Sequence, residues 1–228
     1  MKKILVVLFS LSLSACVVSV SETGSYVPQP QSKTPSFNTQ QGFSEQRLLP
    51  INAKLQAYIA TGKLAGITTL VSRNDQIVHF AAQGMQDRAA GKAMQRDTIF
   101  RIYSMSKPIT AVAALTLWEQ GKFHMNDPIA MYLPELANLK VYVRGSGESM
   151  VLEDAKSPIR IVDLFTHTAG FSYGFTGSEV DKLYRASPMM QGKATPENVL
   201  TELAKLPLNH QPGTQWNYGV NTDVIGFL

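Results

Sequence analysis

The sequence predicts a mixed α/β (α+β) protein, and three patterns carry that prediction. Apolar residues recur at helical spacing over residues 51–59, which favours an amphipathic helix at the start of the globular part. Two β-prone runs, residues 67–72 and 77–82, flank the turn-forming segment Asn74-Asp75-Gln76 and predict an antiparallel hairpin. A second helical pattern ends at Gly121, so helices and antiparallel strands share one chain.

Besides the helix before Gly121, two more elements are predicted within a globular domain over residues 46–228. The helix before Gly121 should bury one apolar face, formed by Ile109, Val112, Ala113 and Leu117. Residues 140–143 and 150–152 flank a glycine-containing turn, which predicts a second hairpin or a surface loop. Residues 159–167 indicate a second buried helix, which we expect Gly170 to cap.

The first 15 residues have the features of an export signal. Lys2 and Lys3 form a positive start, and Ile4 to Leu13 form an apolar core that is too short to span a bilayer. The segment Leu13-Ser14-Ala15-Cys16 resembles the bacterial lipobox, in which the cysteine is lipidated and becomes the new N-terminus. The alternative is an ordinary signal peptide with an incidental cysteine. We expect a lipoprotein signal peptide over residues 1–15.

Residues 16–45 are expected to be a flexible tether, because they are rich in Ser, Gln, Thr and Pro and lack a sustained hydrophobic period. Cys16 is the only cysteine, so no intrachain disulfide can form. The residue after Cys16 is Val17 and not Asp, which in the lipoprotein pattern favours the outer membrane. We therefore expect a lipid-anchored protein on the periplasmic side of the bacterial cell envelope.

Composition excludes several classes of function. Without Lys2 and Lys3 the 228-residue chain has 19 basic and 17 acidic side chains, and no basic run indicates a nucleic-acid partner. The four histidines are scattered and show no metal-ligand spacing, so we expect neither a metal nor another cofactor. The oligomeric state is not predicted.

Ser104-Met105-Ser106-Lys107 is the most informative segment. At positions i and i+3 of a helix two side chains share one face, so the amine of Lys107 can reach the hydroxyl of Ser104. A serine hydroxyl is a poor nucleophile without an adjacent base, which a lysine can supply when burial or a nearby charge keeps it neutral. Pro108 is tolerated in the first turn of a helix, which places this pair at the helix start. Unpaired N–H groups there favour a developing negative charge.

Four segments, in this order, resemble the class C β-lactamase-like serine hydrolases, a family that includes β-lactamases, family VIII carboxylesterases and penicillin-binding-protein-like enzymes. They are Phe100 to Thr110 with the S-x-x-K pattern, Asp127 to Glu135, Leu164-Phe165-Thr166-His167-Thr168-Ala169-Gly170, and Pro212-Gly213-Thr214-Gln215-Trp216-Asn217-Tyr218. The resemblance extends from about Gln46 to the end of the chain. It implies an antiparallel sheet flanked by helices plus an all-helical lobe, with the site between them.

The resemblance also implies roles. Ser104 would be the acylated nucleophile, Lys107 its charge-tuning partner and Tyr218 the general base, in phenolate form. The substrate would be a small ester or β-lactam-like molecule, hydrolysed through an acyl-enzyme. Tyr218 could instead be a packed aromatic with a satisfied hydroxyl. Trp216 is expected to lie in the core, and His167 to be a core histidine with a satisfied ring.

Departures from the family pattern favour an ester over a β-lactam. The second family motif is usually Tyr-x-Asn, but here Tyr218-Gly219-Val220 places Asn221 one residue late. Similar carboxylesterases tolerate that loss, whereas β-lactamases and D-alanyl-D-alanine carboxypeptidases use the asparagine. No third motif is present before Leu228, which lies in an apolar run without a cap. We therefore expect a C-terminally truncated domain that lacks its last strands.

Two alternatives stay open. Gly170-Phe171-Ser172-Tyr173-Gly174 matches G-x-S-x-G, the nucleophile elbow of α/β-hydrolases, with Asp181 and His210 in the right order for a triad. A turn after the preceding helix explains the same glycines. The chain could also be a non-catalytic lipoprotein that binds cell-wall peptide.

Overall fold

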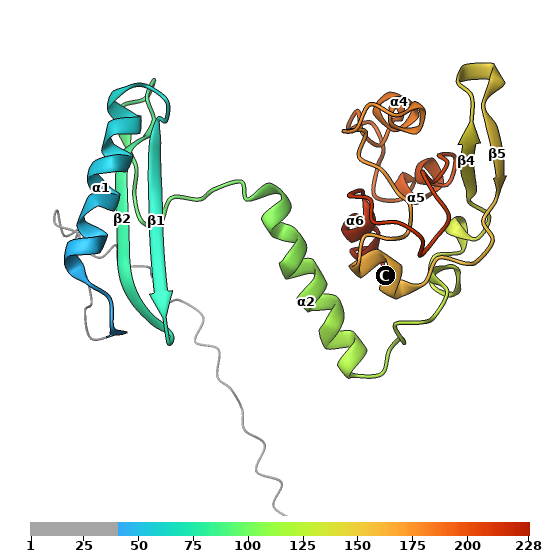
Figure 1. Ribbon diagram of the computed structural model, residues 1–228, viewed down its shortest axis with the longest axis horizontal. Helices are drawn as coiled ribbons and strands as arrows, with labels where there is room; N and C mark the ends of the chain where they lie inside the picture. The colour runs from blue at the N-terminus through green and yellow to red at the C-terminus, as the bar shows by residue number, and fades with distance from the viewer. Residues whose placement is uncertain (1–40) are drawn as a thin grey trace, which may run out of the picture. The chain divides into compact units, whose positions relative to one another are not determined.

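The computed structural model describes residues 41–228, which belong to two compact units divided between Ile99 and Phe100 (Figure 1). The predicted signal peptide, Cys16 and most of the predicted tether lie outside these residues. Within the described part of the chain no helix is both long and apolar enough to cross a bilayer.

The first unit is a helix with a three-stranded antiparallel sheet in the order β1-β2-β3. Its elements are α1 (Glu45–Ala60), β1 (Gly66–Arg73), β2 (Gln76–Asp87) and β3 (Lys92–Ala93). Asn74 and Asp75 form the turn between β1 and β2 with φ values of 52° and 57°, the left-handed conformation that two-residue hairpin turns use. The predicted first helix and first hairpin are therefore confirmed.

The second unit, from Phe100 onward, combines helices, most of them short, with one two-stranded antiparallel hairpin, β4 with β5. Figure 1 shows this hairpin beside the helices of the C-terminal half. The helices and strands are α2 (Ser106–Glu119), β4 (Lys140–Arg144), β5 (Val151–Asp154), α3 (Ile161–Phe165), α4 (Glu179–Ala186), α5 (Val199–Leu203) and α6 (Asn221–Ile225). Short 3-10 turns join them: η2 (Tyr103–Met105), η3 (Ile129–Met131), η4 (Pro134–Leu136) and η5 (Gly147–Ser149). The predicted mixed α/β class with antiparallel strands is confirmed.

The core of the second unit is built around α3. Ile161 and Leu164 have no exposed surface, and α3 packs against α6, from which Val224 is also buried. Tyr184 of α4 and Phe171, in the segment after α3, complete this centre with fully buried rings. Each fully buried side chain of this size stabilises the fold by about 1.5–3 kcal/mol relative to exposure.

The predicted helix over residues 159–167 is shorter than expected. Arg160 is extended, with φ −95° and ψ 159°, and forms an isolated bridge with Pro128, so the helix begins only at Ile161. It ends at Phe165, and His167 is the left-handed residue that follows, with φ 57°. The prediction that Gly170 caps this helix is therefore wrong. Pairing of Arg160 with a distant segment outweighed the local helical period.

The expectation of a buried apolar face on α2 is also wrong. Ile109, Val112 and Leu117 are 65%, 60% and 41% exposed, and Ala114 is the buried residue of the helix. Several of these side chains line an open apolar hollow of about 440 Å³ together with Phe123, Ile225 and Leu228. Helical periodicity records which face is apolar but not which element covers it.

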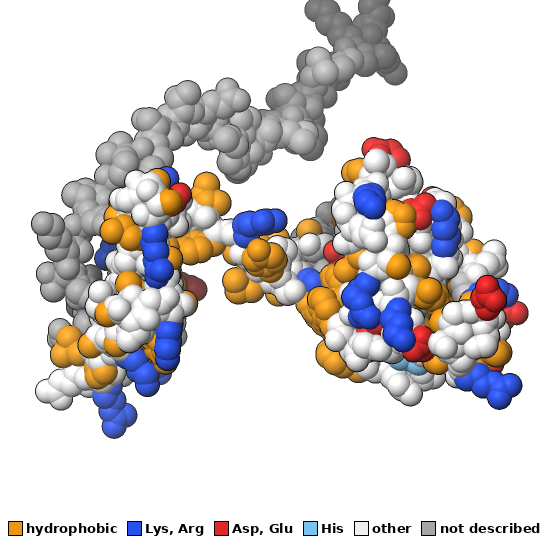
Figure 2. Space-filling view, turned by 90° about the horizontal axis from the view of Figure 1, so that it is seen from above, with side chains coloured by type: hydrophobic (Ala, Val, Ile, Leu, Met, Phe, Trp, Pro, Cys, Tyr) orange, Lys and Arg blue, Asp and Glu red, His pale blue; other side chains and the backbone are white. Residues whose placement is uncertain are grey.

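Charged side chains on the molecular surface are mixed in sign. On the face shown in Figure 2, Lys and Arg side chains lie at several separate places, and acidic and apolar side chains lie between them. On this face the described residues form no single basic stripe of the kind that binds a nucleic-acid backbone.

Candidate active site

The Ser104–Lys107 pair lies where the chain enters α2. Tyr103, with φ 46°, begins the 3-10 turn that contains Ser104, and Lys107 is the second residue of α2. The Nζ atom of Lys107 lies 3.4 Å from Oγ of Ser104, as the i, i+3 spacing predicts. Pro108 occupies the first turn of α2, where its missing N–H breaks no helical hydrogen bond.

Tyr218 completes the group from the other end of the second unit. Its hydroxyl donates a hydrogen bond to Oγ of Ser104 at 2.6 Å, across 114 positions of sequence. The Nζ atom of Lys107 lies 5.1 Å from the centre of the Tyr218 ring. The structure thus brings together the hydroxyl, amine and phenol that the sequence singled out.

Tyr218 is held in place by the segment that follows α3. The backbone N–H of Asn217 donates to O of His167 at 2.8 Å, and its side-chain amide donates to O of Phe171 at 2.7 Å. Gly219 follows, and a Cβ atom at this position would lie 2.2 Å from O of Phe171. Only glycine lets the two backbones approach so closely, so residue 219 fixes where Tyr218 enters the site.

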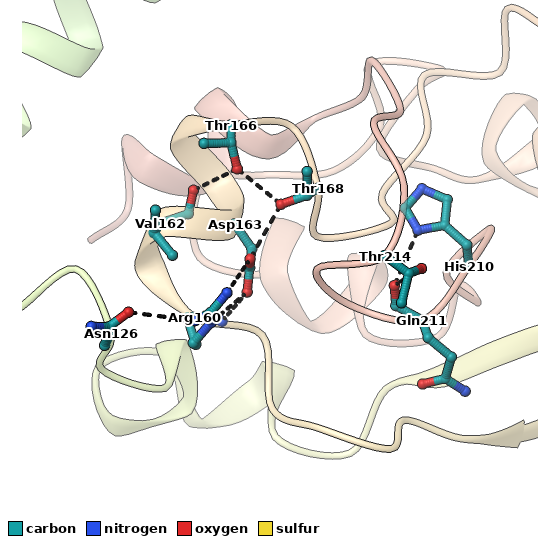
Figure 3. A network of polar contacts seen from close by, with 9 residues as sticks. All are labelled: Asn126, Arg160, Val162, Asp163, Thr166, Thr168, His210, Gln211 and Thr214. Atoms are coloured by element: carbon teal, nitrogen blue, oxygen red, sulfur yellow. Dashed lines mark hydrogen bonds and ion pairs between the residues drawn. The ribbon is translucent and has the colours of Figure 1, made fainter.

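A polar network centred on Asp163 anchors the turn before Tyr218 (Figure 3). The Asp163 carboxylate accepts from the backbone N–H of Arg160 at 2.9 Å, from its guanidinium at 3.1 Å and from the hydroxyl of Thr168 at 3.2 Å. The carbonyl of Thr168 in turn accepts from N–H of Gly213 at 2.9 Å. Only 3% of the Asp163 side chain is exposed. These hydrogen bonds offset the free-energy cost of burying its negative charge.

Lys107 faces two tyrosine rings, and their environments differ. The second ring is that of Tyr173, whose centre lies 4.9 Å from Nζ of Lys107. The hydroxyl of Tyr173 donates a hydrogen bond to the carboxylate of Asp223. Burial, followed by that hydrogen bond, raises the pKa of Tyr173 well above its usual range. The hydroxyl of Ser104, which can donate to the ionised form of Tyr218, and the charge of Lys107 instead hold the pKa of Tyr218 below its ordinary value, although burial and Asp223 oppose the shift. Of the two phenols, Tyr218 is the one poised to accept a proton.

Sequence reasoning did not identify Tyr173 or Asp223 as neighbours of the site. The available signal was weak: Asp223 is an isolated acid in the apolar stretch from Val220 to Leu228. Next to this pair a pocket of about 320 Å³ opens, lined by Lys107, Asp223, Tyr103, Ser106, Thr110, Thr222 and Gly226.

His167 borders the site with a satisfied ring. Its Nδ1 atom lies 2.9 Å from the side-chain amide of Asn221, and its ring centre lies 5.1 Å from that of Tyr218. Burial, reinforced by the nearby charge of Lys107, lowers the pKa of His167, so the neutral imidazole is favoured. In residues 41–228 no group of three or more His, Cys, Asp and Glu side chains could hold a metal ion.

The position where an asparagine would be expected in the second family motif carries an apolar side chain. Val220 is 3% exposed, and Asn221, one residue later, has no exposed surface and contacts His167. Asn221 therefore points into the core and does not replace the missing substrate-binding amide.

Ser172 has no nucleophile-elbow geometry. It is 2% exposed, follows helix α3 where an elbow requires a strand, and donates directly to the carboxylate of Asp181. In a triad a histidine would lie between these two groups, but His210 contacts O of Gln211 through Nδ1. Burial alone would raise the pKa of Asp181, but hydrogen bonds from Ser172, Thr176 and Gly177 lower it. Ser172 and Asp181 form a buried structural pair.

The prediction that Trp216 lies in the core is wrong, because 68% of its surface is exposed. Its ring lies 6.4 Å from that of Tyr218 at an interplanar angle of 27°. Only one residue separates Trp216 from Tyr218 in the sequence, so Trp216 also lies at the edge of the site.

Known proteins with similar sequences and structures include esterases. The chain is 38% identical over 177 residues to Protein Rv1367c of Mycobacterium tuberculosis (strain H37Rv), covering 77% of this chain and 43% of that protein. It is 33% identical over 168 residues to Esterase EstB of Burkholderia gladioli, covering 72% of this chain and 40% of that protein. The solved structure of EstCE1, a hydrolase with promiscuous acyltransferase activity, superimposes with a TM-score of 0.63 at 28% identity, covering 80% of this chain and 46% of that one.

The chain thus spans less than half the length of these relatives. Residues 51–228 match the family described as Beta-lactamase. Because that match covers most of the sequence and every residue of the site, this chain belongs to the Beta-lactamase family.

Proposed function

We propose that this protein is a carboxylesterase-like serine hydrolase that works through an acyl-enzyme on Ser104. The observation that carries the proposal is the contact of Ser104 Oγ with the hydroxyl of Tyr218 at 2.6 Å, next to the ammonium of Lys107. The names of Esterase EstB and EstCE1 support an ester as the substrate.

The reaction follows from this geometry. Tyr218, as phenolate, takes the proton of Ser104, and Oγ attacks the ester carbonyl carbon to form a tetrahedral intermediate. As that intermediate collapses, the bond to the alcohol oxygen breaks and Tyr218 returns the proton to this oxygen. A water molecule then gives one proton to Tyr218 and attacks the acyl carbonyl carbon. The bond between that carbon and Oγ breaks as Tyr218 returns the proton to Oγ, which releases the acid and restores both Ser104 and the phenolate. The positive charge of Lys107 keeps Tyr218 able to accept a proton in each step.

The nucleophile can be identified by covalent labelling of the purified chain with a fluorescent alkyl phosphonate. Intact-protein mass spectrometry should show one adduct, which Ser104→Ala abolishes. Ser172→Ala should keep the labelling rate within a few fold, because Ser172 is buried against Asp181. The lost hydrogen bond should instead lower the free energy of unfolding by about 1–3 kcal/mol. An adduct on Ser172, with labelling retained in Ser104→Ala, would refute the mechanism.

The pH dependence of kcat/KM tests the roles of Lys107 and Tyr218. Lys107 lowers the pKa of Tyr218, so the Lys107→Ala variant should raise it and move the acidic limb of the profile to higher pH. Tyr218→Phe keeps the ring but removes the proton acceptor, and should cost about 10²–10⁴-fold in rate. Lys182→Ala, which removes an exposed lysine paired with Glu179 on α4, is the matched control and should leave the limb in place. An acidic limb that stays in place in Lys107→Ala would contradict these roles.

Substrate class is tested by direct competition of esters with β-lactams. Because Val220 offers no amide to a substrate and Asn221 is buried, short-chain p-nitrophenyl esters should be hydrolysed far faster than nitrocefin or D-alanyl-D-alanine peptides. Efficient nitrocefin turnover with negligible esterase activity would favour a β-lactamase. Binding of cell-wall peptide with neither adduct nor turnover would favour the non-catalytic lipoprotein.

We further propose that Cys16 carries the lipid that anchors the protein to the cell envelope, with the outer membrane favoured. Support comes from the Lys2-Lys3 start, the apolar run and Leu13-Ser14-Ala15 before the cysteine. Several acyl chains on one residue anchor a protein stably, whereas a single chain does so only marginally. Cys16→Ala should therefore move the protein from the membrane fraction to the soluble periplasm. Unchanged fractionation of this variant would exclude the anchor.

A further inference from the structure

Two exposed aromatic rings flank Tyr218. Phe175 is 74% and Trp216 is 68% exposed. Their ring centres lie 6.5 Å and 6.4 Å from that of Tyr218, at interplanar angles of 24° and 27°. Both rings are thus close to parallel with the ring of the proposed general base.

The support beneath these rings is built from ordered side chains. Phe175 stacks on Tyr173 with ring centres 5.4 Å apart and an angle of 20°, and Tyr173 is itself fixed by Asp223 and Lys107. The ring centre of Trp216 lies 6.4 Å from that of His167. Single exposed aromatic residues are ordinary on protein surfaces. Here two exposed rings, each close to parallel with the ring of Tyr218, lie beside a reactive oxygen and form a surface suited to a flat ligand.

The reaction places one part of the substrate beside these rings. On the proposed function, Tyr218 hands its proton to the oxygen of the leaving alcohol, which requires that oxygen within about 3 Å of the tyrosine hydroxyl. The group attached to that oxygen must then lie next to the Tyr218 side chain, whereas the acyl group stays on Ser104. Phe175 and Trp216 are the exposed apolar side chains that neighbour the Tyr218 ring.

We propose that Phe175 and Trp216 form an alcohol subsite that prefers esters whose alcohol part carries a flat aromatic ring. Aromatic rings attract one another in offset-stacked geometry beyond the effect of the buried area alone. A saturated ring of the same size buries a similar area but is too thick for such stacking and lacks a π face. This inference rests on the proposed function, because Tyr218 must act on the leaving oxygen.

The test compares benzyl acetate with cyclohexylmethyl acetate in the full chain. Both esters give the same acetyl-enzyme, so a difference in kcat/KM arises on the alcohol side. We expect benzyl acetate to be preferred by about two- to tenfold, the factor that aromatic contacts typically supply. Phe175→Leu and Trp216→Leu, which keep apolar bulk but lose the flat ring, should each lower this ratio toward one. Met131→Leu, a change at a 66% exposed apolar residue of η3, should leave the ratio unaltered.

A second pair of substrates assigns the subsite to the alcohol and not to the acyl group. The ratio of propyl benzoate to propyl cyclohexanecarboxylate should be the same in the unaltered chain and in both variants. A change in this acyl-side ratio, with the benzyl preference intact, would overturn the assignment.

Phosphonate labelling of Ser104 separates failure of this inference from failure of the proposed function. If the unaltered chain and the variants are labelled but the benzyl ratio is one throughout, or survives both substitutions, the alcohol subsite is refuted and the hydrolase stands. If no adduct forms on Ser104 in the unaltered chain, the proposed function fails and the subsite falls with it.

Discussion

The ammonium group of Lys107 lies 3.4 Å from the Ser104 hydroxyl. Its distances to the ring centres of Tyr173 and Tyr218 are similar to each other, at 4.9 Å and 5.1 Å. The two phenols therefore differ in burial and in hydrogen-bond partners and not in their distance from this cation. Tyr218 shares a hydrogen bond with Ser104, whereas the hydroxyl of Tyr173 donates a hydrogen bond to the Asp223 carboxylate. These partners, together with the burial of Tyr173, push the pKa values of the two phenols in opposite directions, although their ring centres are only 5.4 Å apart.

The core of the second unit supplies the frame for this arrangement. The segment after α3 binds the segment around Tyr218 through hydrogen bonds to the carbonyls of His167 and Phe171. The two backbones can approach so closely because Gly219 has no side chain. The same segment carries Ser172, whose bond to Asp181 ties it to α4. Two buried carboxylates, Asp163 and Asp181, therefore sit on either side of the segment that positions Tyr218. Their full complement of donors makes burial tolerable and fixes one conformation of the loop.

Membership of the Beta-lactamase family does not by itself decide between ester and β-lactam chemistry. The local difference is at Val220 and Asn221: the first is apolar and nearly buried, and the second turns inward to His167. The aromatic side chains of Phe175 and Trp216 are the features that this chain presents next to Tyr218 in place of an amide. An apolar, flat surface beside the proton acceptor suits an ester with an apolar alcohol better than it suits a peptide.

Local features could be predicted from the sequence: the Asn74-Asp75 hairpin, the Ser104–Lys107 pair on one helical face, and, through resemblance, the segment with Tyr218. These depend on backbone preferences and on spacings of a few residues, which the sequence records directly. Tertiary structure decided the rest. The exposed face of α2, the extended Arg160, the exposure of Trp216 and the meeting of Tyr173 with Asp223 all depend on partners far along the chain. A pattern of apolar residues fixes which side of an element is hydrophobic, but only the packing of distant segments determines what that side meets.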